Sequence, residues 1–136
     1  MQTNVKDLVT AISGPGGLNK LGNADLPVKM AYRIGRLLDS ARSAGKALQK
    51  ERERLFDEMG VFVKDPDGND TTERTIPEEK HKEFSETLED FMAGTMVDIW
   101  YEPVKLSEIE ECNVRLSAAD MIAIAPFIDT EDGSER

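Results

Sequence analysis

The feature that most constrains this chain is a heptad-like stripe of apolar and small residues within residues 28–59. The stripe recurs at spacings of 4, 3, 4, 3, 4 and 7 and consists of Met30, Ile34, Leu37, Ala41, Ala44, Leu48 and Leu55. These spacings place every member on one face of an α-helix, and only Glu51 interrupts the seam. The pattern therefore predicts one continuous helix with a length of about 45 Å.

A helix of that length exceeds the diameter of a compact domain of 136 residues. We therefore expect one end to project, or the stripe to pair with another helix, within the chain or between chains. The seven stripe residues are candidate interface residues, and Trp100 is an eighth. Trp100 and Tyr101 are adjacent, so on a strand they point to opposite faces, and the exposed one would anchor an interface. The alternative that both belong to the core stays open.

Local signals predict shorter elements around this helix. Residues 5–12 fit a short helix or a strand equally well. Asp25 is placed to cap the long helix, with Leu26 and Pro27 in its first turn. Apolar and β-branched residues at 61–64 and 71–75 flank a Pro-Asp-Gly turn, which is typical of a β-hairpin.

The second half of the chain contains three capping signals. Thr75 and Glu78 form a capping box that would begin a helix over residues 77–93. Residues 95–104 have the pattern of a strand interrupted at Pro103. Similar capping boxes at 107–110 and 117–120 predict two short helices, of which the last ends at Pro126.

These elements predict an α+β fold in one domain spanning residues 1–136. We expect one long heptad-patterned helix, a β-hairpin plus one further strand in a small antiparallel sheet, and two or three shorter helices. Residues 13–17 would form a flexible Gly-rich loop, and residues 129–136 an acidic, mobile tail.

Charge is unevenly distributed along the chain, whose net charge is −10. Residues 28–59 contain eight Lys/Arg and five Asp/Glu, whereas the remainder contains nine and twenty-two. An acidic chain is a poor general ligand for nucleic acid, because whole-molecule repulsion opposes phosphate contacts. Two interpretations remain: acidic neighbours neutralise the basic segment internally, or the acidic surface attracts a basic partner.

The cysteine content and hydropathy bear on where the protein works. A lone cysteine, Cys112, excludes an internal disulfide and suits a reducing compartment. No apolar run approaches 18 residues, and the N-terminus lacks the features of a signal peptide. We therefore expect an intracellular protein with no membrane partner.

The glycine-rich stretch at residues 12–20 looks at first like a phosphate-binding loop. Such a loop needs a second glycine where Asn19 stands and a Ser or Thr where Leu21 stands, so a nucleotide site is not expected. The turn acids Asp65 and Asp67, with Asn69, resemble the start of a calcium loop. The later ligand positions lack the required Gly and Glu, so a hairpin turn explains them better and weak calcium binding stays open.

Residues that could perform chemistry are sparse. His81 is the only histidine and lies among charged residues, so no zinc site is expected. Cys112 has no histidine nearby in sequence to activate it as a nucleophile. We expect no catalytic residue, no metal and no cofactor, and therefore not an enzyme.

The segments 18–21 and 25–34 resemble the start of a family of small phage proteins of uncharacterised function, in which an LNKL…LPVK-x-AY-x-I phrase leads into a long charged helix. The later pieces of the family pattern are a Gly-Asn hairpin, an IP-E helix start, a short strand and an L…P-F-I ending, which correspond to residues 67–69, 76–79, 96–100 and 116–128. Residues 13–17 look inserted and the acidic tail looks added. The resemblance implies a phage or prophage origin and carries over no activity.

Our leading hypothesis is therefore a non-catalytic phage protein that acts through protein–protein contacts. It would be a virion or assembly component or an accessory homo-oligomer, located in the host cytoplasm or the virion, and its partners would be itself or other phage proteins. The alternative is an acidic regulator that occupies a nucleic-acid-binding site on a basic host protein.

Overall fold

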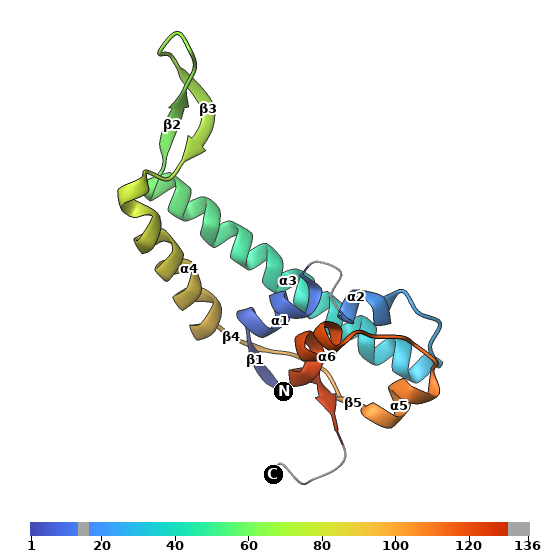
Figure 1. Cartoon of the computed structure of the whole chain (residues 1–136). Coiled ribbons are helices and arrows are strands. Elements are labelled where there is room, and N and C mark those ends of the chain that lie inside the picture. The colour runs from blue at the N-terminus through green and yellow to red at the C-terminus, as the bar shows by residue number, and fades with distance from the viewer. Residues whose placement is uncertain (14–16, 131–136) are drawn as a thin grey trace.

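The computed structural model of the chain describes residues 1–13 and 17–130. It has the α+β architecture that the sequence predicts, arranged as a body and a projecting arm (Figure 1). The arm, residues 51–94, holds the end of α3 (Val28–Met59), β2 (Val61–Lys64), β3 (Asp70–Thr75), η1 (Glu78–Lys80) and α4 (His81–Gly94). The body holds the first part of α3 with β1 (Gln2–Asn4), α1 (Val5–Ile12), α2 (Gly17–Gly22), β4 (Met96–Asp98), β5 (Val104–Lys105), α5 (Leu106–Glu111), α6 (Ala118–Ile124), η2 (Ala125–Phe127) and β6 (Ile128–Asp129).

Helix α3 joins the two regions, and its predicted end at Met59 is confirmed. Its first half is buried under α1 and α2, and its second half runs out of the body toward the hairpin (Figure 1). One end therefore projects, as the length of the helix led us to expect.

The start of α3 differs from the prediction. Pro27 is the N-cap residue, with φ −54° and ψ 147°, and Asp25 is exposed and does not cap the helix. The residue before a proline is excluded from the helical region by a clash with the proline ring. Leu26 could therefore not lie in the first turn, and the helix begins one residue after the proline.

The N-terminal segment resolves the ambiguity at residues 5–12 in favour of a helix. The Asn4 side chain accepts a hydrogen bond from the Asp7 N–H at 2.8 Å, which caps α1. Val5, Leu8 and Ala11 on one face of α1 are buried in the core. Burial against α3, and not sequence periodicity, therefore decides the element type.

The loop predicted at residues 13–17 does not include Gly17. Gly17 is the first residue of α2 and is buried, while residues 14–16 lie outside the described residues. A Cβ built on Gly17 would lie 2.7 Å from the carbonyl oxygen of Asp120, so α2 approaches α6 more closely than a side chain permits. Gly17 is thus a packing residue and not part of a flexible loop.

The strands form three separate two-stranded pairs instead of one small antiparallel sheet. The hairpin β2–β3 is antiparallel, as predicted, but the further strand β4 pairs with β1 and does not join it. A third, parallel pair joins β5 to β6. The predicted sheet was wrong in this respect because the partner of β4 lies more than 90 residues away, in a segment with no strand signature of its own.

The arm follows the predicted order with one corrected boundary. Gly68 has a φ of +84° in the hairpin turn, where the Asp65 carboxylate accepts hydrogen bonds from the N–H groups of Asp67 and Asn69. Thr75 is the last residue of β3, paired with Val61, so it does not cap the following helix. Pairing within the hairpin takes precedence, and the helix begins as the 3₁₀ turn η1 after Pro77.

The C-terminal segment contributes α5, α6, η2 and β6 to the body. Ser117 and Asp120 form the predicted capping box at the start of α6, and Pro126 lies in η2 directly after that helix. Lys105, and not Ser107, precedes α5, and its N–H donates to Glu108. Asp129 lies in β6 beside Lys105, so the predicted tail does not begin at 129, and residues 131–136 lie outside the described residues.

Candidate interaction surface

The predicted interface stripe on α3 is occupied by contacts within the chain. Met30, Ile34, Leu37, Ala41 and Ala44 are buried in the core of the body, and Leu48 is half-buried beside it. Leu55 is buried farther along, in the arm. Of the eight predicted interface residues, Trp100 alone is exposed, with 78% of its surface accessible.

The position of Trp100 follows from the residues on either side of it. Side chains alternate along residues 96–101, so that Ile99 and Tyr101 are buried and Trp100 points outward. The Tyr101 hydroxyl donates to the Phe127 carbonyl at 2.6 Å and accepts from the Val104 N–H at 3.2 Å. Burial raises the pKa of this phenol, which keeps it neutral and able to donate. Tyr101 is therefore fixed in the core, and Trp100 is fixed outside it.

Two residues of α3 complete the surface around this indole. The guanidinium carbon of Arg36 lies 4.8 Å from the centroid of the Trp100 ring and 5.9 Å from that of Tyr32. Tyr32 is 62% exposed and one helical turn before Arg36. Exposed cation–π contacts of this kind each contribute about 0.5–1 kcal/mol. We call Trp100, Arg36 and Tyr32 the Trp100 surface.

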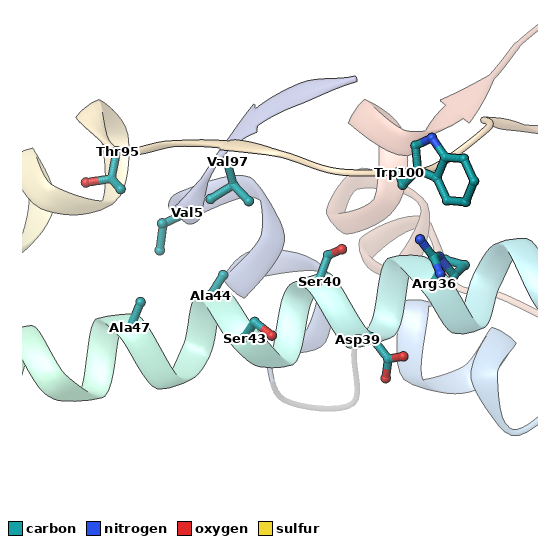
Figure 2. Close-up of a pocket in the computed structure, with 10 residues that line it drawn as sticks. All are labelled: Val5, Arg36, Asp39, Ser40, Ser43, Ala44, Ala47, Thr95, Val97 and Trp100. Carbon is teal, nitrogen blue, oxygen red and sulfur yellow. The ribbon is translucent and has the colours of Figure 1, made fainter.

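Two open hollows lie on either side of Trp100, and Arg36 lines both. The larger, about 420 Å³, lies between α3 and β4 and is lined by Val5, Arg36, Asp39, Ser40, Ser43, Ala44, Ala47, Thr95, Val97 and Trp100 (Figure 2). Small side chains of α3 form one wall, and Val97 of β4 points toward them from the other (Figure 2). The smaller hollow, about 350 Å³, reaches from Trp100 past Tyr32 to Glu102.

The chemistry of the larger hollow suits packing more than catalysis. Its walls combine small apolar groups with serine and threonine hydroxyls, and its charged members are Arg36 and Asp39. Such a lining can accept an apolar side chain and hydrogen-bond the backbone beside it. No histidine or cysteine is among its lining residues.

Direct ion pairs neutralise only part of the basic segment. Arg33 pairs with Glu108 at 3.0 Å and donates to the carbonyls of Glu102 and Pro103, and Arg54 pairs with Glu51 and Glu58. The other cations of α3 make no ion pair with any residue that the structure describes: Lys29, Arg36, Arg42, Lys46, Lys50 and Arg52. Internal neutralisation therefore accounts for two of the eight basic residues of this segment.

The other residues that could bind a metal or act as a nucleophile make contacts within the chain. His81 is exposed, with its Nε2 2.7 Å from the Ile76 carbonyl oxygen. The Cys112 thiol donates to the Glu108 carbonyl at 3.1 Å and lies 3.6 Å from the Met30 sulfur. Within residues 1–13 and 17–130, no three His, Cys, Asp or Glu side chains gather as a metal site. The turn residues Asp65 and Asp67, considered for calcium, serve the hairpin turn.

Sequence reasoning identified Trp100 but not its two neighbours on α3. Tyr32 and Arg36 are spaced four apart on the outer face of the helix, which is a visible helical pair. The contact of Arg36 with Trp100 joins residues more than 60 positions apart, and no local signal reports such a contact. The sequence therefore predicted the anchor and not the surface around it.

None of the helices in the described residues is long and apolar enough to cross a membrane. Comparisons of the chain with protein-family models, with curated proteins and with solved structures gave no match.

Proposed function

We propose that this protein acts through protein–protein contact, without catalysis, and that the Trp100 surface is its contact site. The observation that carries the proposal is the exposed indole of Trp100, held by Arg36 between two open hollows. Large exposed aromatic side chains beside a hollow mark interaction sites, and Trp, Tyr and Arg are the residues that most often dominate binding energy.

The surface suits a second copy of the chain as its first partner. An indole that projects beside a hollow gives one patch both a knob and a hole, and a two-fold dimer requires such a self-complementary patch. The resemblance to small phage proteins adds the proposal that a virion or assembly component is the partner in the infected host. Either partner would bury Trp100.

Sedimentation velocity over a concentration series tests the proposal. In molar salt, which screens contacts between exposed charges, we expect association of the wild-type chain to be lost in Trp100→Ser and kept in Ile122→Ser, because Ile122 is an equally exposed apolar residue of α6, at 76%. If the wild type remains monomeric, a photo-crosslinking residue at Tyr32 should capture a partner from infected cells that Trp100→Ser fails to capture. Association or capture that is unchanged in Trp100→Ser would contradict the proposed site.

A second candidate function, the acidic binder of a basic protein, rests on α4. Glu83, Glu86 and Asp90 are exposed on this helix, and Glu79 precedes them in η1. Binding through this acidic row would weaken steeply with salt, because exposed charges are screened. Retention of a basic partner at low salt and its release at high salt would support this candidate, whereas binding that salt does not affect would argue against it.

A further inference from the structure

We propose that the acidic row of α4 in one copy docks on a basic row of α3 in the next copy, so that the chains assemble head to tail. The basic row is Arg42, Lys46 and Lys50, and the acidic row is Glu79, Glu83, Glu86 and Asp90. This inference rests on the proposed function, because it also assumes action through contacts, but it uses surfaces that exclude Trp100.

The basic row lies on the side of α3 opposite its buried stripe. At about 100° per residue, Arg42, Lys46 and Lys50 are centred roughly 160° from the buried residues Leu37, Ala41 and Ala44. All three cations are exposed, and none makes an ion pair with a described residue. The row therefore presents three free positive charges to solvent over two turns of helix.

The acidic row has the matching arrangement on α4. Its members are spaced 4, 3 and 4 apart, and all four are exposed. Phe84 and Phe91, on the other side of α4, face the rest of the molecule: Phe84 lies 5.4 Å from Phe56 of α3, and Phe91 packs against the core. Among the residues that the structure describes, the carboxylates of the row form an ion pair only with Lys82, which is 3.9 Å from Glu86 and itself highly exposed. The carboxylates are thus available to an external cation.

The placement of the two rows decides the type of assembly. Each row faces away from the side of its helix that packs within the chain, so the rows lie on different sides of the α3–α4 pair. One copy can therefore offer its basic row to one neighbour and its acidic row to another. Such a heterologous contact produces a ring or an open filament, unlike a closed two-fold dimer.

Charge complementarity favours a second copy over nucleic acid as the occupant of the basic row. The rows extend over similar lengths, nine residues on α3 and twelve on η1 and α4, and they carry opposite charge. The net charge of −10 opposes any anionic partner at long range. At physiological salt the screening length is about 8 Å, so repulsion between distant parts of two copies is reduced while charges in contact still attract.

Charge reversal with complementation tests this inference by sedimentation velocity at physiological salt. The test is made in the Trp100→Ser background, which removes the Trp100 contact, and there we expect assemblies that dissociate in molar salt. In that background the triple variants R42E/K46E/K50E and E83K/E86K/D90K should each be monomeric, because most of the contacts between the two rows would join like charges. An equimolar mixture of the two should assemble again, since each contact then joins opposite charges. Lys29→Glu and Glu111→Lys in the same background, which change exposed charges outside the rows, should assemble as Trp100→Ser does.

Different experimental results would overturn this inference and the proposed function. Assembly that survives both triple variants, a mixture that does not reassemble, or a Trp100→Ser chain that stays monomeric at physiological salt would overturn the inference. Loss of association in Trp100→Ser in molar salt would then leave the proposed function standing. A single-stranded DNA oligonucleotide is the probe for the rival occupant. Its binding by the wild type and not by R42E/K46E/K50E, without self-assembly, would also overturn the inference.

Discussion

The body and the arm of this protein share one helix but are held together differently. In the body, α1, α2, α3 and α6 enclose a core in which Leu8, Leu18 and Phe127 are completely buried. In the arm, α4 has no buried residue, and the hairpin β2–β3 leaves Val61 and Phe62 about half exposed. The body therefore specifies the fold, whereas the arm extends surface and charge away from it.

This difference explains where functional contacts would be found. In the body, Trp100 is exposed although the residues on either side of it are buried. The packing of those two neighbours therefore fixes Trp100 at the surface. The arm is a two-helix pair with a two-stranded ribbon, and an isolated ribbon of this kind is only marginally stable in water. Contacts with another molecule are expected to stabilise the arm more than the body.

The largest expected difference in stability is between two Phe→Ala substitutions, one in the body and one in the arm. Phe127→Ala in the body removes a ring that is fully buried, and it should lower the free energy of unfolding by about 3 kcal/mol or more. Phe84→Ala in the arm removes a half-buried ring and should cost about 1 kcal/mol. Urea unfolding measures both changes, and equal losses would contradict the distinction between the regions.

A pair of glycine substitutions should give the next largest contrast. Gly17→Ala forces a Cβ against the backbone of Asp120 and should destabilise the body by about 1–3 kcal/mol. Gly94→Ala at the end of α4 meets no atom within 4 Å, so it should be neutral or slightly stabilising. Thermal melts of the two variants check this. A neutral Gly17→Ala would show that α2 can move away from α6.

The pH dependence of the body should include Asp120. Hydrogen bonding to Lys20 foremost, and to the Ser117 backbone, lowers the pKa of this carboxyl below its ordinary value of 3.8. A carboxyl whose pKa is lowered by folding stabilises the protein above the ordinary value, and that contribution is lost as pH falls through the folded-state pKa. Asp120→Asn should therefore lower the melting temperature at pH 7, and the difference from wild type should shrink below pH 3.8.

Melting curves of wild type and Asp120→Asn at neutral and acidic pH would measure this change. Lys82→Gln, which removes an exposed ion pair with Glu86, is a control for general loss of an ion pair. A difference between wild type and Asp120→Asn that is constant with pH would show that the carboxylate charge does not matter.

The smallest effect is expected at the exposed hairpin. Phe62→Ser removes a ring that lies 5.2 Å from the Arg74 guanidinium carbon, and it should cost at most about 0.5–1 kcal/mol. Hydrogen exchange should quicken in β2 and β3 and stay unchanged in α1. Faster exchange in α1 would show that the arm and the body unfold as one unit.

The parts of the fold that local sequence determines were predicted, and the parts that distant contacts determine were not. The end of α3, the hairpin turn at Gly68 and the Ser117 cap all follow from residues within a few positions of each other. The pairing of β1 with β4 joins segments more than 90 residues apart, and the close packing of Gly17 depends on α6. Local patterns contain no information about either contact.

The candidate site also combines a feature that local sequence predicts with one that depends on distant contacts. The alternation along residues 96–101 predicted that Trp100 and Tyr101 face opposite sides. Which of them is exposed depends on the hydrogen bonds of the Tyr101 hydroxyl with Phe127 and Val104, which only the folded body supplies. The heptad stripe could have paired within or between chains, and its burial under α1 and α2 shows that it pairs within.

The fluorescence of Trp100 tests the central claim most directly, because it is the only tryptophan of the chain. In the dilute protein, the exposed indole should emit at long wavelength and be readily quenched by acrylamide. As sedimentation shows the chain associating, or as a captured partner is added, emission should shift to the blue and quenching should fall. In molar salt, where contacts between the charged rows are screened, association that leaves Trp100 as quenchable as in the free chain would contradict a contact site at this surface.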